Sequence, residues 1–345
     1  MSNRLGISCL DVGQGDCTFI IPPRGEGHPI LVDCADPYVA ERFVSNHTIT
    51  DLHAVVASHL DDDHVRGLLP FLRNHFEAGR RVGTLVIGLD RHLPTELPGG
   101  GALDLIEAAL RWEETPPHPG FRVAPPFRTD QPVMLAQGTD WSVGLVLPWY
   151  GAWTRAIRAE RGRSNRCSAV LRITRGPTAI LLGGDAPLGS WERLEDRLRP
   201  ARAIRVSHHG GDIREGGQRW SDYQDLYDAV GATVAVLSVG TRNGYGHPLE
   251  EHAHAIRRGG DCRLLCTQVT PRCHDDLAGL RERAIELTSH AEWPYRHKGA
   301  RARDEVPCAG TIVLWLDARG HLEVEPSLRA HEQQLLHIGH PLCRR

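Results

Sequence analysis

Residues 57–67 read Ala-Ser-His-Leu-Asp-Asp-Asp-His-Val-Arg-Gly. This stretch follows an apolar segment, Ala54 to Ala57, that predicts a β-strand, and it precedes a helix-like segment from Leu68 to Phe76. Neutral imidazole and ionised carboxylate are both good ligands for first-row metals. His59, Asp61, Asp63 and His64 are therefore candidate metal ligands. The alternative is a solvated acidic helix N-terminus, where capping and the helix dipole favour Asp.

Three further strand-like segments end in Asp or His. Residues 180–182 lead into Gly-Gly-Asp185, residues 204–206 into Ser-His208-His209-Gly-Gly, and residues 236–239 into a loop that carries Tyr-Gly-His247-Pro. In α/β folds, reactive groups collect at the carboxyl ends of the strands. Four strand ends that carry Asp and His are hard to explain by packing alone.

Short apolar runs alternate with helical stretches along the 345 residues, which predicts an α/β fold. A hydrophobic content of 41% excludes global disorder, and a net charge of -3 excludes a polycationic chain. We expect one domain over residues 1–345, because the irregular stretches Pro94 to Gly101 and Pro116 to Pro132 separate no regions of different composition. Residues 269–307 are expected to form a Cys/His/Arg-rich insertion. With no signal-peptide-like segment or membrane-length apolar run, a cytoplasmic location is expected.

The motifs occur in the order typical of the metallo-β-lactamase-fold hydrolases. The chain most resembles the branch that includes the hydrolase domain of ComEC-type DNA-uptake competence proteins. The resemblance rests on Leu-Asp11-Val-Gly-Gln-Gly-Asp16, Ile-Leu-Val-Asp33-Cys and the His/Asp loop, followed by Asn165-Arg-Cys-Ser-Ala-Val-Leu171, Gly-Asp185, His208-His209-Gly and Gly-His247-Pro. It implies a four-layer αββα sandwich with metals at one edge.

Carried over by position, the resemblance assigns the metal ligands. His59 and Asp61 would bind one ion, Asp63 and His64 the other, Asp185 would bridge them and His247 would complete the second site. Four residues would support the ligands from behind: Asp33, which would orient the metal loop, with Asp11, Asp16 and Asn165. Asp61 stands where the superfamily usually has His, and the third superfamily histidine has no counterpart, since its region offers only Asn165 or Cys167. This oxygen-rich set favours Mn²⁺, with Zn²⁺ as the alternative, in one or two sites.

The expected activity is hydrolysis by a metal-activated hydroxide, since a divalent metal lowers the pKa of bound water toward about 7. Asp63 would orient or deprotonate the water. His208 or His209 would bind phosphate or protonate the leaving oxygen; alternatively, one ring ligates metal and the other is buried. The resemblance favours a phosphodiesterase or nuclease acting on DNA or RNA. Hydrolysis of a lactone, thioester or β-lactam is a second possibility, and a catalytically weak binding module is a third.

Two further features bear on ligands. Arg155, Arg158, Arg161 and Arg163 form a basic stretch that would contact nucleic acid, unless it is a solvated helix face. Cys266, Cys273, His274 and Cys308 form a candidate structural zinc site, with His290 or His297 as substitutes for His274. This site assumes that the strand before Cys266 pairs with the strand after Cys308. Ordinary buried cysteines are the alternative.

Overall fold

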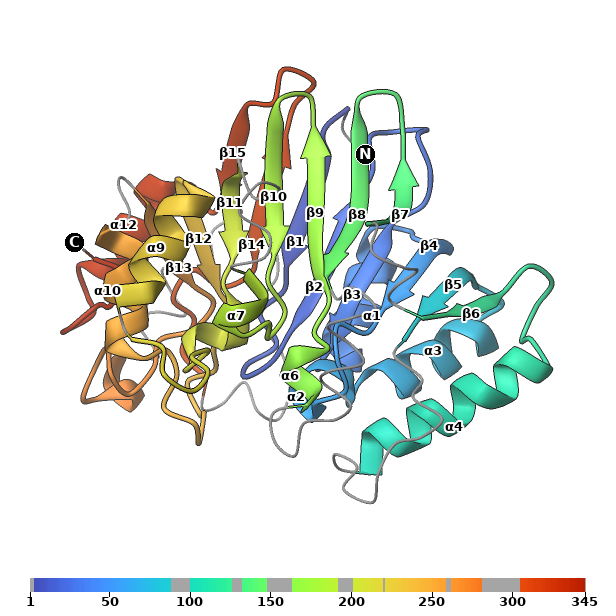
Figure 1. Ribbon diagram of the computed structural model, residues 1–345, viewed down its shortest axis with the longest axis horizontal. Coiled ribbons are helices and arrows are strands. Elements are labelled where there is room, and N and C mark those ends of the chain that lie inside the picture. The colour runs from blue at the N-terminus through green and yellow to red at the C-terminus, as the bar shows by residue number, and fades with distance from the viewer. Residues whose placement is uncertain are drawn as a thin grey trace.

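The computed structural model describes residues 3–87, 100–125, 132–147, 163–191, 201–219, 221–258, 262–280 and 305–344. Its described strands form two mixed sheets (Figure 1). In order, the first sheet contains β15 (Leu322–Glu325), β14 (Ile312–Leu316), β1 (Leu5–Cys9), β2 (Cys17–Ile21), β3 (Ile30–Cys34), β4 (Asp51–Val56), β5 (Arg81–Val86) and β6 (Arg122–Ala124). The second contains β13 (Arg263–Cys266), β12 (Val234–Leu237), β11 (Ala201–Arg205), β10 (Thr178–Leu182), β9 (Val170–Arg175), β8 (Trp141–Leu147) and β7 (Val133–Gln137).

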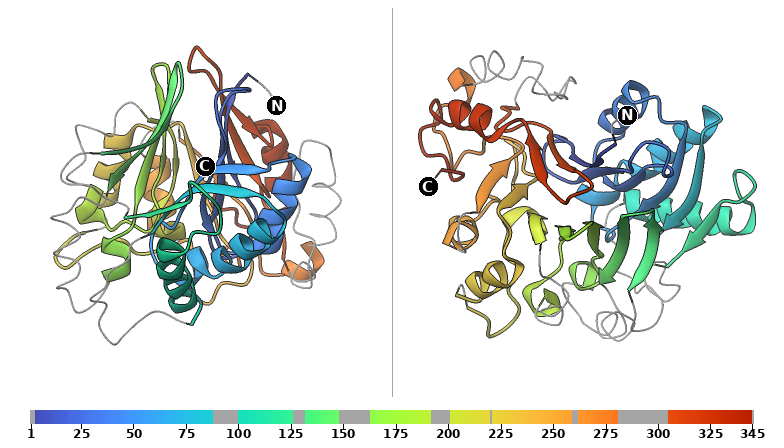
Figure 2. Two further views of the ribbon diagram at one scale, coloured as in Figure 1. Left: turned by 90° about the vertical axis from the view of Figure 1, so that its right-hand side faces the viewer. Right: turned by 90° about the horizontal axis from the view of Figure 1, so that it is seen from above.

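Helices cover the outer face of each sheet (Figure 2). The first sheet carries α1 (Pro37–Asn46), α3 (Leu68–Glu77) and α4 (Gly100–Glu114), and the short α2 (Asp62–Val65) lies at its edge. The second sheet carries α7 (Leu188–Trp191), α9 (Ser221–Val230), α10 (Glu250–Arg258) and α12 (Leu328–Leu335). Two one-turn helices, α6 (Arg163–Arg166) and η2 (Ser207–Gly210), lie in loops of the second half.

Buried apolar residues fall into three separate cores, which define four layers. Alternation along the strands produces this division, because successive side chains point to opposite faces. In β3, Leu31 packs under the helices of the first sheet, whereas Ile30 and Val32 face the second sheet. In β10, Leu181 packs under the helices of the second sheet and Ile180 faces inward. The four-layer αββα sandwich predicted from the sequence is confirmed.

Parallel pairing brings the carboxyl ends of several strands to one edge of the sandwich. β3 is parallel to β4, and β10, β11, β12 and β13 are all parallel. A backbone hydrogen bond of 2.7 Å from Ala169 to Ser58 joins the edges of the two sheets. The loops that follow β3, β4, β10 and β11 therefore meet at this edge, and these loops carry the candidate ligands.

Some expected elements differ from the structure. The stretch from Pro116 to Pro132 was expected to be irregular, but it contains β6, which extends the first sheet by parallel pairing with β5. The strands expected to bring Cys266 and Cys308 together do not pair, because β13 and β14 lie in different sheets. The bulk of the expected insertion, residues 281–304, lies outside the described residues, so the single-domain assignment stays a prediction. No helix in the described ranges is long and apolar enough to cross a membrane.

Candidate metal centre

The metal loop is fixed from behind by Asp33, the fully buried carboxylate near the end of β3. Its Oδ1 accepts a hydrogen bond from the Ser58 amide at 2.7 Å, and its Oδ2 accepts from the Ser58 hydroxyl at 2.7 Å. The same Oδ2 lies 2.8 Å from His64 Nδ1. Asp33 thus holds the chain that leaves β4 and one imidazole at once, the supporting role predicted for it.

These contacts set the tautomers of both loop histidines. A carboxylate only accepts, so His64 Nδ1 carries the proton and His64 Nε2 keeps a bare lone pair. The Ser58 hydroxyl already donates to Asp33, so it accepts from His59 Nδ1 at 3.0 Å, which leaves His59 Nε2 bare as well. Metal-ligating histidines show this arrangement, with one ring nitrogen hydrogen-bonded and the other free to bind.

The second sheet contributes Asp185 at the end of β10. The Asp185 amide donates to Ser168 Oγ at 2.8 Å. Gly184 before it has a φ of 49°, and a Cβ there would lie 2.3 Å from Ser168 Oγ. Glycine is therefore required at this turn. Asn165 was expected to support the metal ligands. Its backbone carbonyl accepts a hydrogen bond from the Ser168 amide at 3.0 Å. The Ser168 hydroxyl, and not Asn165, accepts the hydrogen bond from the Asp185 amide. The sequence analysis did not single out Ser168.

His208 and His209 follow β11 on a strained turn. Both have left-handed backbones, with φ of 54° and 53°, which non-glycine residues adopt infrequently. His208 Nδ1 donates to the Asp212 carbonyl at 3.0 Å, and His209 Nδ1 donates to the Ser238 carbonyl at 2.8 Å. Their Nε2 atoms are therefore bare too, and both point at Asp185.

The two oxygens of Asp185 face two different pairs of histidine nitrogens. Oδ1 lies 3.1 Å from His64 Nε2 and 4.0 Å from His209 Nε2. Oδ2 lies 3.5 Å from His59 Nε2 and 3.8 Å from His208 Nε2.

A carboxylate completes each group. Asp63 Oδ2 is 3.2 Å from His209 Nε2, and Asp61 Oδ2 is 3.5 Å from His59 Nε2. Asp185 thus lies between the two groups, and its role as a bridge between two cations stays a prediction. His209 stands where the resemblance had assigned His247.

The charges of the centre favour a cation. Burial and the neighbouring His64 would lower the pKa of His59, but the Asp185 and Asp61 carboxylates together outweigh them and raise that pKa to about 9. Burial likewise opposes the charge of His64, whose pKa Asp185 and Asp33 raise well above its ordinary value. Burial would raise the pKa of Asp185, yet the two imidazoles hold it well below its usual range. Without a metal, His59 and His64 therefore carry a proton on Nε2 as well near neutral pH, and a metal ion would take the place of that proton on the same lone pair.

Unpartnered polar atoms give a direct test of whether the residues fit a metal. Among the described residues, the buried atoms without a hydrogen-bond partner include the Nε2 of His59, His64 and His209 and the Oδ1 of Asp185. Leaving such an atom unsatisfied costs about 1–3 kcal/mol each. They belong to two groups, Asp16, His64, Asp185 and His209 in one and His59, Asp61 and Asp185 in the other, and within each group the ligand atoms lie within 4.8 Å of one another. Imidazole and carboxylate lone pairs converging in this way fit one or two divalent cations.

The remaining predicted residues surround the centre. Asp16 lies 3.5 Å from His64 Nδ1 and 3.4 Å from His209 Nδ1 and pairs with Arg205, so it supports the rings from the side away from Asp185. Asp11 lies further out, where its Oδ1 accepts from the Gln268 amide at 2.7 Å. The His247 ring lies 5.1 Å from the His208 ring. Arg155, Arg158 and Arg161 lie outside the described residues, as does the side chain of Arg163.

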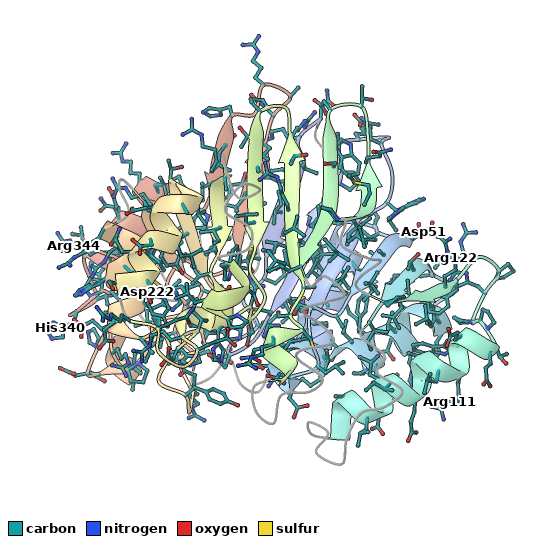
Figure 3. The ribbon with its side chains drawn as sticks, viewed as in Figure 1. Asp51, Arg111, Arg122, Asp222, His340 and Arg344 are labelled. Carbon is teal, nitrogen blue, oxygen red and sulfur yellow. The ribbon has the colours of Figure 1, made fainter. Side chains whose placement is uncertain are left out.

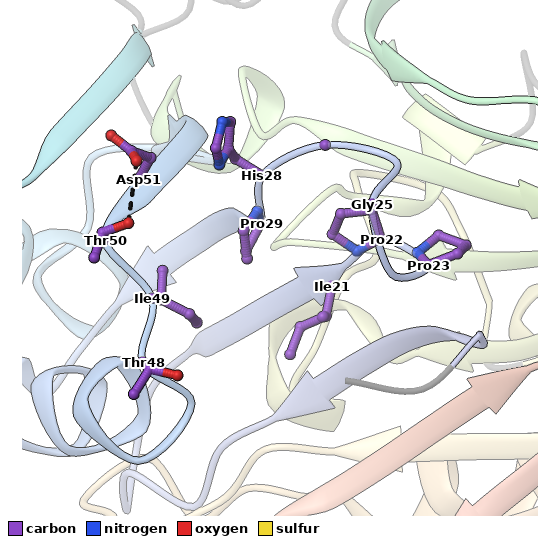
Figure 4. Close-up of a pocket in the computed structure, with 11 residues that line it drawn as sticks. Ile21, Pro22, Pro23, Gly25, His28, Pro29, Thr48, Ile49, Thr50 and Asp51 are labelled. Atoms are coloured by element: carbon purple, nitrogen blue, oxygen red, sulfur yellow. Dashed lines mark hydrogen bonds between the residues drawn. The ribbon is translucent and has the colours of Figure 1, made fainter.

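A surface pocket lies at the other ends of β3 and β4 (Figure 4). The turn between β2 and β3 and the segment before β4 form its walls, and the Thr50 hydroxyl donates to Asp51 there at 3.1 Å. Since the metal loop follows the carboxyl end of β4, this pocket is not part of the centre.

Of the four predicted zinc ligands, the structure places Cys308 in a group with His331 and Cys343, two residues that no sequence pattern indicated. Cys266 lies beside this group, with its Sγ 3.1 Å from that of Cys343. The His274 Nδ1 atom instead accepts from the Asp276 amide at 3.0 Å. His290 and His297 lie outside the described residues.

Residues 10–123 match the family model of the Metallo-beta-lactamase superfamily. A search of curated proteins found no match. Among solved structures, the metallo-beta-lactamase fold protein YhfI from Bacillus subtilis is 12% identical, with a TM-score of 0.45, over 76% of this chain and 96% of its own. Human tRNase Z, short form, is 12% identical, with a TM-score of 0.41, over 69% of this chain and 93% of its own.

CmlA, a diiron beta-hydroxylase from Streptomyces venezuelae, is 15% identical, with a TM-score of 0.46, over 75% of this chain. The chain spans about half of CmlA, 51% of its length. The match over residues 10–123 and the two facing sheets lead to one assignment. The chain has the metallo-beta-lactamase fold, and its residues 10–123 are similar to the Metallo-beta-lactamase superfamily.

Proposed function

We propose that the protein is a metal-dependent phosphodiesterase that acts on DNA or RNA. One observation carries this proposal: the Nε2 atoms of four histidines surround Asp185, and each of its two oxygens faces a different pair of imidazoles. The superfamily consists mostly of metal-dependent hydrolases. Paired metals about 3.5–4 Å apart are typical of phosphatases and nucleases, where they stabilise the attacking and leaving oxygens.

Two features favour a phosphodiester over a lactam or lactone. Three carboxylates, Asp61, Asp63 and Asp185, make the ligand set rich in oxygen, which suits hard cations that also bind phosphate oxygens. The segment from Leu10 to Asp16 resembles the ComEC-type branch, and it packs against the centre, where Asp16 supports His64 and His209. The ComEC-type relationship and the preference for Mn²⁺ over Zn²⁺ belong to this proposal.

The residues divide into three roles. His59, Asp61, Asp63, His64, Asp185 and His209 would hold the cations, which when bound supply Lewis acidity and a nucleophile at neutral pH. Asp33 and Asp16 orient the imidazoles. His208 is assigned to the substrate, because its side chain is 27% exposed whereas those of His59, His64 and His209 are at most 1% exposed. Its Nε2 would hydrogen-bond a phosphoryl or leaving oxygen.

The test compares hydrolysis of several ester classes by the purified full chain. A chromogenic phosphodiester and single- and double-stranded DNA and RNA are assayed with Mn²⁺, Mg²⁺ and Zn²⁺, beside a lactone, a thioester and a β-lactam. We expect hydrolysis of the phosphodiesters, lost in Asp63→Ala and retained in Asp51→Ala, which removes a carboxylate at the other end of β4. Hydrolysis of the lactone, thioester or β-lactam alone contradicts the proposal. A metal-loaded protein inactive on every substrate would be a binding module.

A further inference from the structure

A second cluster of metal-ligating side chains lies in the C-terminal part of the second half. Cys266 ends β13, Cys308 precedes β14, His331 lies in α12, and Cys343 lies in the C-terminal segment. The Sγ atoms of Cys266 and Cys343 are 3.1 Å apart, and Cys308 Sγ is 3.3 Å from His331 Nε2. The ligand atoms of Cys308, His331 and Cys343 all lie within 4.8 Å of one another. Cys308, His331 and Cys343 thus form a group of three candidate ligands, and Cys266 lies beside this group, next to Cys343.

The backbone holds these segments together independently of the side chains. The Cys308 amide donates to the Thr267 carbonyl at 3.0 Å, and the Ala309 amide donates to the Cys266 carbonyl at 2.8 Å. The Gln334 side chain donates to the Pro307 carbonyl at 3.1 Å, which fixes α12 to the same segment. Labelled residues on either side of Cys343, His340 and Arg344, mark this region at the edge of the molecule (Figure 3). The cluster is therefore built into the fold.

The spacing suits a tetrahedral metal. With Zn–S bonds of about 2.3 Å and Zn–N bonds of about 2.0–2.1 Å, neighbouring ligand atoms lie roughly 3.5–3.8 Å apart. The atoms of Cys308, His331 and Cys343 already lie close to this spacing, whereas the Cys266 side chain, 3.1 Å from Cys343, must turn toward Cys308 and His331 to complete it. We propose that this cluster is a structural zinc site with the ligands Cys266, Cys308, His331 and Cys343.

The chemistry of these side chains agrees with a metal ligand set, because thiolate sulfur and neutral imidazole nitrogen are both zinc ligands. A Cys266–Cys343 disulfide would need the sulfurs about 2.05 Å apart, and it would leave Cys308 and His331 without a role.

A closed set of four protein ligands indicates a structural rather than a catalytic ion. Cys266, Cys308 and Leu335 belong to the apolar core of the second sheet, so the ion would lie beside packed side chains. It would join β13, the segment before β14, α12 and the C-terminal segment. Cys273 lies in the same core, but its sulfur contacts the Thr270 hydroxyl at 3.6 Å. Cys273 is therefore the matched buried thiol outside the proposed set.

The test uses Co²⁺ as a spectroscopic probe of the metal-free full chain. The active centre offers no sulfur ligand, so thiolate-to-Co²⁺ charge-transfer absorption reports only the cysteine site. We expect this band to saturate at about one equivalent and to disappear on addition of Zn²⁺. Cys343→Ser and His331→Gln should each lower the affinity by at least tenfold. Cys273→Ser and Asp185→Asn should retain the wild-type band and affinity.

Several results would overturn the proposal. These are an unchanged band in Cys343→Ser, loss of the band in Cys273→Ser but not in His331→Gln, and a Cys266–Cys343 disulfide in protein prepared under reducing conditions. Removal of residues 343–345 provides a second variant, because it deletes one ligand at the chain end without altering a strand or helix. Far-UV circular dichroism verifies that each variant is folded. Undiminished Co²⁺ binding by the folded truncation also contradicts the site.

Discussion

Three residues at the metal centre adopt a backbone conformation that usually belongs to glycine. Asp33, His208 and His209 have φ of 58°, 54° and 53°, and in the described chain the only other non-glycine residue with positive φ is Thr48. Each such residue costs about 1–3 kcal/mol, against a typical net stability of about 5–15 kcal/mol. Strain of this size persists when it positions side chains. Here it turns His208 and His209, adjacent in sequence, toward the same carboxylate.

Replacing His208 or His209 by Asn, which tolerates the left-handed backbone, should affect metal affinity and turnover differently at the two positions. His209→Asn removes a buried nitrogen beside Asp63 and Asp185, so we expect at least tenfold weaker metal binding and loss of turnover. His208→Asn should retain metal affinity and lower kcat by about 10²–10⁴-fold, the usual contribution of a proton-transferring group. Isothermal titration and steady-state kinetics measure the two effects. Equal loss of metal affinity in both variants contradicts the division of roles.

At the level of elements, the centre depends on how closely the ends of the strands approach each other. The Gly184 turn lies against Ser168 and the Ala169 carbonyl, 2.3 and 3.0 Å from where a Cβ would lie. Gly79, after α3, has a comparable φ of 71°, but a Cβ there would meet nothing within 4 Å. The two glycines therefore separate the effect of backbone strain from the effect of crowding.

Gly79→Ala should lower the free energy of unfolding by about 1–2 kcal/mol, the cost of a side chain in the left-handed region. Gly184→Ala should lower it further, because the new methyl group displaces β10 from Ser168. It should also weaken metal binding, since Asp185 follows directly. Urea unfolding and metal titration measure these effects. An identical loss of stability in both variants, with unchanged metal affinity in Gly184→Ala, would refute the packing argument.

Helix α10 carries a buried histidine that should make stability depend on pH. His252 Nδ1 donates to the Gly211 carbonyl at 2.8 Å, so its Nε2 accepts from the Tyr227 hydroxyl at 2.5 Å, and the ring is neutral. Burial lowers its pKa from 6.5 to about 4. Below pH 6.5 the unfolded chain takes up a proton that the folded chain does not. The contribution of His252 to the free energy of unfolding is therefore complete above pH 6.5. It falls by up to about 1.4 kcal/mol per pH unit as the pH drops toward 4.

His252→Gln retains a donor and an acceptor but cannot titrate. Its free energy of unfolding should fall less steeply than that of the wild type between pH 6.5 and 4.5. The difference between the two slopes reports His252 alone. His59, whose pKa is raised, affects stability in the opposite direction, but it does so equally in the wild type and in the variant. Urea unfolding at several pH values measures the slopes. Parallel slopes would show that His252 does not contribute.

At the scale of the whole molecule, sequence patterns predicted the four layers of the fold and pointed to the loop from His59 to His64. They did not predict which residues distant in sequence come into contact. The loop from His59 to His64 is local, so its spacing alone indicates ligands. The positions of His331 and Cys343 relative to Cys266 depend on how α12 and the C-terminal segment pack on the second sheet, which no local pattern encodes. For the same reason, the sequence did not predict that His209, and not His247, lies beside Asp63.

The centre joins the two halves of the sandwich, so removal of the metal should destabilise the whole fold. His59 and His64 follow a strand of the first sheet, whereas Asp185 and His209 follow strands of the second. A cation present at 100 times its Kd stabilises the native state by about 2.7 kcal/mol, so chelation should lower Tm by several degrees. Adding Mn²⁺, which prefers oxygen and nitrogen to sulfur, should restore Tm in the wild type but not in Asp185→Asn. Equal recovery in the two proteins would show that the cation does not bridge the sheets through Asp185.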